Sequence, residues 1–312
     1  MAENPELLTA VARLYYLEGL GQTEIASLYA VSRSTVSRML TSARDRGIVR
    51  ISVDDYDPRD RELEAQLVER FGLRRAIVVR GLEGDVEANR RAVGYFAAPE
   101  VATWLRGARR VGMTGGRTLG ALVRALPPST ATPGAQVVQL MGTVAASPGP
   151  NEGSELGRTL AGRLSATFHA VNTPALVEDA ATRDTFLSHE QIRAVWRMFE
   201  GISLAFVGVG SIEDSMFVEH NVLSPDLRAQ LRERGAMAEV CGRYIDRAGY
   251  EIDLPTCDRV ISAELTTLRR IDEVVAVTSG VGRGDAVRAV LNGKLASSLV
   301  TDAACARAVL AG

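Results

Sequence analysis

The chain of 312 residues is 46% hydrophobic and 24% charged, a balance typical of soluble globular proteins, and its length predicts two domains at about 100–200 residues each. The formal net charge of −2 excludes a protein that is polycationic overall, so any nucleic-acid binding has to come from a local basic patch. The three cysteines are widely spaced without a CxxC pair, and the three histidines lie far apart, so we expect no disulfide framework, metal site or cofactor.

The N-terminal segment reads MAENPELL, which has neither the basic start nor the apolar run of a signal peptide. No run of about 18 apolar residues occurs, so we expect no membrane span and a cytoplasmic protein. Asn4 and Pro5 predict the start of a helix, with Asn4 as the N-cap and Pro5 at the first helical position. Apolar residues follow at helical spacing from Leu7 to Leu17.

The next segment predicts two helices joined by a tight turn. We expect a short helix over residues 22–29, a turn over 30–32 and a second helix over 33–45. The small side chain of Ala26 suits the closest point of two steeply crossing helices, and Val31 fills the gap between them. This arrangement predicts a helix-turn-helix, whose second helix enters the major groove of DNA.

The outward face of that second helix interleaves short hydroxyl side chains with arginine. Hydroxyls bond phosphates or base edges, and arginine makes two-pronged contacts to guanine. Residues 33–50 contain five arginines and one acid, a local charge of +4. A solvated helix of an unrelated bundle would show a similar face, and Arg33 and Arg38 suit phosphate contacts as well as base contacts. The predicted DNA-binding residues are Gln22, Thr23, Ser32, Arg33, Ser34, Thr35, Ser37 and Arg38.

Residues 48–53 alternate between apolar and polar side chains, as a half-buried strand does. We expect this strand to close the small domain as a wing. The acidic segment 54–58, which ends in Pro58, is typical of a linker. We therefore expect a winged helix-turn-helix domain over residues 1–55 and a second domain over residues 56–312.

From about residue 60 onward, short β-rich runs alternate with helical stretches. This order predicts an α/β fold with a mostly parallel, doubly wound sheet. Ligands of such sheets bind at the carboxyl ends of the strands, near the point where the strand order reverses. The expected strands are 76–79, 111–113, 137–141, 204–209, 260–263, 274–278 and 298–301. The expected helices include 62–71, 86–105, 156–164, 190–199, 225–234, 285–291 and 303–310.

The strongest candidate for a ligand site is Gly115, Gly116, Arg117 and Thr118, which follow a predicted strand and open a helix. Two glycines let backbone N–H groups approach an anion, and the helix N-terminus adds favourable partial charge. The alternative is a glycine turn required only by chain geometry. The segment lacks the Walker spacing and the GxGxxG pattern, which disfavours nucleoside triphosphates and dinucleotides.

Other strand ends carry further candidates. Arg243 and Asp246 suit hydrogen bonds to sugar hydroxyls, or they pair with each other. Arg283 lies in a second glycine-rich turn and is either a second anion ligand or a solvated side chain. The Pro/Gly-rich loop over residues 142–155 is typical of a lid. It contributes Asn151 and Glu152 as further candidates.

Six segments in the same order resemble the SorC family of sugar-responsive bacterial regulators. They are TEIASLYAVSRSTVSRML, VGMTGGRTL, LAFVGVGSI, VCGRYID, VAVTSGVGRGDAVRAVL and SSLVTDAACARAVL, and the match covers almost the whole chain. The resemblance implies an effector domain similar to sugar-phosphate isomerases and deaminases. It also implies a homotetramer, a dimer of dimers, that binds palindromic operator DNA and responds to a phosphorylated sugar, a sugar or a polyol.

The resemblance also implies which residues bind the effector. The family's phosphate-cradling loop matches residues 115–118, and its polar pair after the lid matches Asn151 and Glu152. An acidic residue near the sugar hydroxyls matches Asp246. Arg283 falls where many members have a lysine, which keeps the charge although guanidinium and ammonium differ as anion ligands.

These observations predict a sequence-specific DNA-binding regulator of carbohydrate metabolism that is gated by its effector and has no catalytic residue. The rival interpretation is a sugar-phosphate isomerase or deaminase with a DNA-binding appendage. No acid/base constellation supports the rival, because neither histidine nor lysine falls at the predicted strand ends and Glu152 and Asp246 are isolated carboxylates. A third class is a nucleoid protein without an effector.

Overall fold

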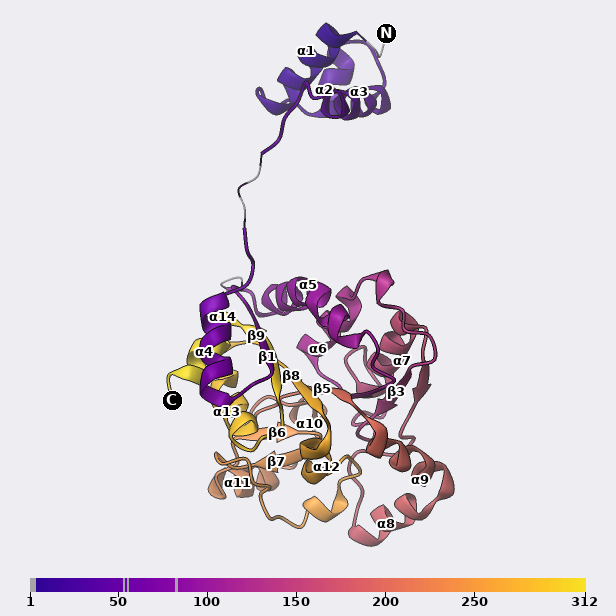
Figure 1. The fold of residues 1–312 in the computed structure, drawn as a ribbon, viewed down its shortest axis with the longest axis vertical. Coiled ribbons are helices and arrows are strands. Elements are labelled where there is room, and N and C mark those ends of the chain that lie inside the picture. The colour runs from indigo at the N-terminus through magenta and orange to yellow at the C-terminus, as the bar shows by residue number, and fades with distance from the viewer. Residues whose placement is uncertain (1–3, 53, 55, 82–83) are drawn as a thin grey trace. The chain divides into compact units, whose positions relative to one another are not determined.

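In a computed structural model, which describes residues 4–52, 54, 56–81 and 84–312, internal contacts divide the chain into two units. The first unit is Met1–Tyr56 and the second is Asp57–Gly312. Each unit folds around apolar cores of its own, and Figure 1 shows their elements in chain order.

The N-terminal unit is a helix-turn-helix built from α1 (Pro5–Tyr16), α2 (Gln22–Leu28) and α3 (Arg33–Asp45). Ser32 caps α3, because its hydroxyl accepts a hydrogen bond from the Thr35 N–H at 3.1 Å. The bounds of α3 are those expected from the sequence. The three helices enclose a core of Leu8, Val11, Ala12, Ile25, Ala26, Val36, Met39, Leu40 and Ala43.

The segment after α3 does not form the expected wing. Residues 48–52 are described and form no strand, while Val53 and Asp55 lie outside the described residues. Val49 instead packs half-buried against the helical core, and its N–H donates to the Ala43 carbonyl at 3.1 Å. An alternating pattern produces a strand only where a second strand pairs with its backbone, and the helices of this unit provide none. The expected wing is wrong for this reason.

The C-terminal unit is built on a parallel sheet with the strand order β1-β9-β8-β5-β2-β3-β4. From β2 the chain continues to β3 and β4 on one side, and from β5 to β8 and β9 on the other. The strand order therefore reverses between β2 and β5, and the predicted doubly wound α/β fold is confirmed. The strands are β1 (Arg75–Val79), β2 (Arg110–Met113), β3 (Gln136–Gln139), β4 (Thr167–His169), β5 (Leu204–Gly208), β8 (Glu273–Val277) and β9 (Ser298–Asp302).

Helices cover both faces of this sheet. Successive residues of a strand point to opposite faces, so each strand contributes to two cores. Ile77 and Val79 of β1 belong to the core beneath α5, α6 and α7, whereas Val78 belongs to the core beneath α4, α12, α13 and α14 (Figure 1). No helix of the described residues is long and apolar enough to cross a membrane. The helices are α4 (Arg61–Phe71), α5 (Val86–Leu105), α6 (Arg117–Ala125), α7 (Gly153–Leu164), α8 (Ala180–Ser188), α9 (Glu190–Arg197), α10 (Met216–Glu219), α11 (Pro225–Glu233), α12 (Leu265–Arg270), α13 (Gly284–Asn292) and α14 (Ala303–Leu310).

Residues 260–263 do not form the strand expected there. Val260 and Ser262 make isolated bridges to Leu176 and Met141 instead. The sheet has no place for them beside β8, because β5 and β9 already pair with its two edges. A short apolar run indicates burial, and here the burial comes without membership of the sheet.

A two-stranded hairpin follows α11 and was not expected from the sequence. It pairs β6 (Ala238–Val240) with β7 (Arg243–Ile245) in antiparallel register. The turn residues Cys241 and Gly242 have positive φ values of 53° and 74°, as a tight two-residue hairpin turn requires. The usual signal for such a turn is Asn-Gly or Asp-Gly. Here a cysteine, which seldom adopts a positive φ, takes the first position, and the hairpin was therefore not expected.

Helix α5 packs so closely on α6 that a side chain at Gly94 has no room. A Cβ atom there would lie 2.5 Å from the carbonyl carbon of Ala121. We expect Gly94→Ala to lower the free energy of unfolding by about 3 kcal/mol, because overpacking against backbone strains the core. Denaturant titration followed by tryptophan fluorescence measures this, since Trp104 and Trp196 both lie in the C-terminal unit.

The matched control is the same substitution at Gly162 of α7, where nothing lies within 4 Å of the Cβ position. Alanine favours a helix more than glycine does, so Gly162→Ala should raise the free energy of unfolding by about 0.5–1 kcal/mol. Equal unfolding midpoints for the two variants would contradict the close packing of α5 on α6.

Candidate functional site

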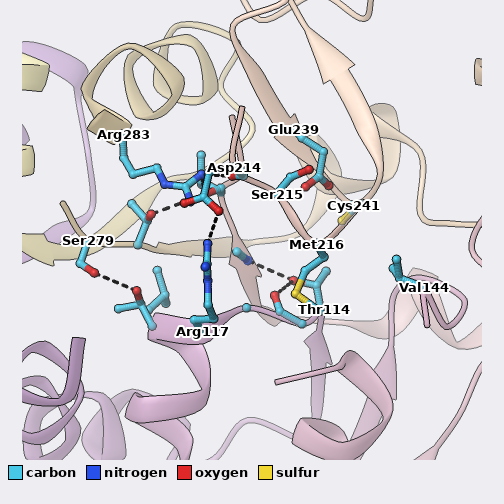
Figure 2. Close-up of a pocket in the computed structure, with 18 of the residues that line it drawn as sticks. Thr114, Arg117, Val144, Asp214, Ser215, Met216, Glu239, Cys241, Ser279 and Arg283 are labelled. Carbon is cyan, nitrogen blue, oxygen red and sulfur yellow. Dashed lines mark hydrogen bonds and ion pairs between the residues drawn. The ribbon is translucent and has the colours of Figure 1, made fainter. Parts of the chain in front are cut away.

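A pocket lies at the carboxyl edge of the sheet, where the strand order reverses (Figure 2). Its walls are the loops that follow β2, β5 and β8, together with the β6–β7 hairpin and the start of α7. Because β8, β5 and β2 are neighbours in the sheet, loops that are far apart in sequence meet here. Its polar lining includes Thr114, Gly115, Gly116, Arg117, Thr118, Glu152, Asp214, Glu239, Ser279 and Arg283.

Two glycines bring the loop after β2 close to the segment before α7. A Cβ atom at Gly115 would lie 2.8 Å from the carbonyl oxygen of Asn151, and Gly116 has a φ of 150°. The Gly116 N–H donates to the Asn151 carbonyl at 2.9 Å. This N–H is therefore engaged within the protein, and the first-turn N–H groups of α6, which begins at Arg117, are the backbone donors that the loop leaves open.

Two arginines from different loops converge on the carboxylate of Asp214. Arg117 donates to one carboxylate oxygen and Arg283 donates to the other, as Figure 2 shows. The exposed fraction of the side chain is 28% for Arg117 and 11% for Arg283. Burial alone would raise the pKa of Asp214, but the positive charges of Arg283 and Arg117 outweigh it and lower that pKa. The pocket therefore contains a preformed position for an anionic group.

Hydroxyl groups connect the three loops of the pocket. The Thr118 and Ser279 hydroxyls are hydrogen-bonded at 2.9 Å and link the loop after β2 to the loop after β8. The Thr114 hydroxyl accepts from the Gly208 N–H at 3.0 Å and donates to the Gly115 carbonyl at 3.1 Å. These bonds fix the loops relative to one another and leave hydroxyl oxygens at the pocket surface.

Glu239, from β6, places a buried carboxyl group at the pocket (Figure 2). It accepts a hydrogen bond from the Gly242 N–H at 2.5 Å, and it forms no ion pair within the described part of the chain. Burial raises its pKa to about 7, against the opposing effects of that hydrogen bond and of Arg283. A carboxyl group that titrates near neutrality can accept or donate a hydrogen bond to a ligand hydroxyl.

Glu152 closes another side of the pocket and holds the loop after β3. Its side chain is 2% exposed and accepts from the Ala145 N–H at 3.2 Å. His220 Nε2 lies 3.6 Å from the same carboxylate oxygen. Burial raises the pKa of Glu152, although these backbone and imidazole partners oppose the shift.

Of the effector residues expected from the sequence, the structure brings Arg117, Glu152, Arg283 and the other members of the 115–118 loop together at the pocket. Asn151 lies outside it, and its side-chain oxygen accepts from Arg124 at 3.1 Å.

Asp246 also lies outside the pocket. Its carboxylate accepts from the N–H groups of Ala248 and Tyr250, each at 2.9 Å, and so shapes the turn after β7. Arg243, which the sequence suggested as a partner of Asp246, pairs instead with Glu251 at 2.8 Å. The acid that reaches the pocket from this hairpin is Glu239, on the strand before the turn.

Sequence reasoning missed Thr114, Asp214, Glu239 and Ser279 as pocket residues. Thr114 and Ser279 lie in the same segments after β2 and β8 as the predicted loop 115–118 and Arg283, but neither was chosen as a ligand residue. Glu239 lies inside a strand that was not expected. Asp214 carried one usable signal, because two cations gathered at one edge of a sheet need a counter-ion.

The expected DNA-binding residues gather on α2, α3 and the turn between them. Thr23, Ser32, Arg33, Ser34, Ser37 and Arg38 are exposed, and Gln22 and Thr35 are half-buried. The Ser32 hydroxyl is engaged with Ser34 at 2.7 Å and with Thr35 at 2.8 Å. Within the described residues, Arg33 and Arg38 form no ion pair, so α3 presents cations without a protein counter-ion.

The raised pKa of Glu239 predicts how stability depends on pH. A carboxyl group that binds its proton more tightly when folded contributes stability that is fully present below about pH 4.5 and is lost as the pH rises through 7. Glu239→Gln cannot ionise, so from about pH 5 to about pH 8 the variant should gain on the order of 3 kcal/mol relative to wild type. Denaturant titrations of both proteins at the two pH values measure this. A difference that does not change with pH would contradict the shift.

Known proteins are similar to this chain along nearly its whole length. Residues 58–311 match the family model described as "Putative sugar-binding domain". The sorbitol operon regulator of Klebsiella pneumoniae is 27% identical over 320 residues, which cover 99% of each chain. The deoxyribonucleoside regulator of Bacillus subtilis is 26% identical over 309 residues, which cover 99% of this chain and 98% of the relative.

The likeness extends to three dimensions. The crystal structure of the full-length sorbitol operon regulator SorC from Klebsiella pneumoniae superposes with a TM-score of 0.75 at 26% identity, covering 98% of this chain and 99% of that one. The family model spans most of the chain and the relatives span nearly all of it. The chain therefore belongs to the SorC family of sugar-binding transcriptional regulators.

Proposed function

We propose that this protein is a transcription regulator that binds operator DNA through α3, and that a phosphorylated sugar or polyol in the pocket gates this binding. The observation that carries the proposal is the convergence of Arg117 and Arg283 on one carboxylate at the edge of the sheet. Two guanidinium groups that meet on one oxyanion, beside the N-terminus of α6, provide the charge and the donors that a phosphate group needs.

The rest of the pocket suits the hydroxyl-bearing part of such a ligand. Glu239 offers a carboxyl group of raised pKa, and the hydroxyls of Thr114 and Ser279 lie on the neighbouring loops. A buried polar site discriminates between ligands because any group left unpaired costs free energy. We infer that the arginines bind the phosphate end and that Glu239 contacts a hydroxyl of the sugar or polyol.

The DNA-binding proposal rests on the exposed face of α3. Ser32 caps the helix, and Arg33, Ser34, Ser37 and Arg38 are exposed on its outer face. We propose that these side chains contact DNA together with Gln22, Thr23 and Thr35. The effector would favour one arrangement of subunits and so change the spacing of recognition helices, which must be about 34 Å apart to meet successive major grooves. We propose a homotetramer, a dimer of dimers, as the assembly that couples the two events.

An isomerase or deaminase is the rival function, and it needs an acid/base pair beside the substrate. No histidine or lysine is among the described residues that line the pocket. The carboxylate–imidazole pair nearby is Glu152 with His220, and Glu152 already holds the loop after β3 through the Ala145 N–H. We propose that the protein binds its ligand without turnover. Conversion of ribose 5-phosphate, glucosamine 6-phosphate or deoxyribose 5-phosphate during incubation would overturn this.

Removing a cation from α3 tests the DNA proposal. We expect Arg38→Ala to weaken binding to an operator selected from a random duplex library, with the slope of log K against log salt smaller by about 0.9 if one phosphate contact is lost. Fluorescence anisotropy at several salt concentrations measures both quantities. Arg158→Ala, on the exposed face of α7, is the control and should change neither. An unchanged affinity and slope for Arg38→Ala would remove Arg38 from the interface.

Removing a pocket arginine tests the effector proposal. We expect the melting-temperature shifts caused by ribose 5-phosphate, glucosamine 6-phosphate and deoxyribose 5-phosphate to exceed those of the parent sugars in wild type. Arg117→Ala should weaken binding of the active phosphate about 10–100-fold, the effect of losing one charge-assisted hydrogen bond, while operator affinity is retained. If Arg117→Ala and Arg283→Ala both respond like wild type, the effector binds elsewhere.

A further inference from the structure

We propose that Asp214 is a specificity-determining residue whose carboxylate occupies the anion position of the pocket, so that a ligand has to displace it from Arg117 and Arg283. The proposal rests on the proposed function, because it assumes that the same two arginines bind the anionic group of the effector. It adds a selection rule, which is that a phosphate group competes with the Asp214 carboxylate and a weaker anion does not.

The geometry is that of a bound ligand anion. Each carboxylate oxygen of Asp214 accepts from a different arginine, and Arg283 also donates to the backbone carbonyl of Asp214 (Figure 2). Figure 2 shows Asp214 between the guanidinium groups of Arg117 and Arg283. The internal carboxylate thus uses the donors that a phosphate would need.

The cations are held more firmly than the acid. Arg283 is largely buried and has a further acceptor in the Val209 carbonyl at 3.4 Å, and Arg117 projects from the first turn of α6. The Asp214 side chain is 47% exposed. Its segment is a local turn, in which the Ser211 N–H donates to the Asp214 carbonyl and the Asp214 N–H donates to the Ser211 hydroxyl, each at 3.1 Å. If this side chain rotated away, Arg283 would keep the Val209 carbonyl and Arg117 would keep Glu219 at 3.9 Å, so both cations would remain at the pocket.

Charge balance explains why a carboxylate is present at all. Arg117, Arg283 and the half-buried Arg90 all line the pocket, and like charges gathered in a partly buried site repel one another. The Asp214 carboxylate offsets part of this repulsion in the unliganded protein. Glu219 of α10 lies 3.9 Å from Arg117 and adds to the effect. Asp214 and Glu219 therefore provide counter-charges for the pocket arginines within the protein itself.

The same balance sets the selection rule. An acid tethered to its partners acts at an effective concentration on the order of millimolar, so a free carboxylate of equal charge gains little by replacing it. A phosphate ester brings about −1.5 to −2 charges and three acceptor oxygens, and so gains additional attraction to both guanidinium groups. A neutral sugar carries no negative charge that could replace the Asp214 carboxylate between the two arginines. We infer that Asp214 restricts the pocket to phosphate esters.

Calorimetric titrations of wild type and Asp214→Asn with inorganic phosphate, acetate and ribose 5-phosphate test this inference. Without the competing charge, the variant should bind phosphate at least about 10-fold more tightly and should also bind acetate. Glu213→Gln is the matched control, because it removes the same charge from the adjacent residue, whose carboxylate pairs with Arg232 at 2.7 Å on the surface. The control should behave like wild type.

Binding that is unchanged or weaker in Asp214→Asn overturns the inference, since Asp214 would then orient the arginines. If ribose 5-phosphate still binds wild type in a way that depends on Arg117, the proposed function survives that result. If neither wild type nor the variant binds inorganic phosphate or ribose 5-phosphate, the result contradicts both the inference about Asp214 and the proposed function.

Two further measurements apply if the variant is poorly folded. In phosphate-free buffer Asp214→Asn should melt below wild type, and added phosphate should raise its melting temperature more than that of wild type. Wild type alone should bind phosphate at least about 10-fold more tightly than acetate, and equal binding of the two anions also overturns the inference.

Discussion

Strand β5 pairs in parallel with β2 on one side and with β8 on the other, and the strand order reverses between β2 and β5. Parallel strands end at the same edge of a sheet, so this pairing aligns the loops after three strands that are distant in sequence. Arg117 follows the first of them and Arg283 the last, and the pairing alone brings them to one point. Loss of the β2–β5 register would separate the two cations even if both loops kept their conformations.

The ionisable groups that line the pocket lower the stability of the fold, because burying a charged group costs free energy. Arg283 and Glu239 are buried ionisable groups, and burial shifts the pKa of each toward its neutral form. Protein cores compensate such groups with partners, and Asp214 provides one for the arginines. Glu239 has a backbone N–H from the hairpin turn and no cation within ion-pair distance in the described chain. Glu239 is therefore the buried group of the pocket for which a ligand hydroxyl would add a polar partner.

The N-terminal unit shows a different division of roles. Its core is a closed set of apolar side chains from α1, α2 and α3, and Ser32 is consumed in capping α3. The arginines on the outer face of α3 contribute nothing to that core, so they are available to a partner of opposite charge. The same chain carries a sugar-binding domain over residues 58–311, as other members of the SorC family do.

Local sequence determined the elements whose stabilising contacts are themselves local. Helical spacing and Ser32 defined α3 over Arg33–Asp45, and alternating β-rich and helical runs defined the doubly wound sheet. The glycine loop at 115–118 and the turn with Arg283 were recognisable because small residues at strand ends have few other uses.

Only the tertiary structure decided which polar groups meet. The expected wing failed because no second strand was present to pair with it, and residues 260–263 found both edges of β8 occupied. Asp246 lies on the same hairpin as Glu239, but Glu239 lines the pocket and the carboxylate of Asp246 bonds to the backbone of its own turn. The role of Asp214 depends on the convergence of Arg117 and Arg283, which only the tertiary structure shows. Sequence patterns report what each segment can form, whereas contacts between segments depend on pairings that no local pattern encodes.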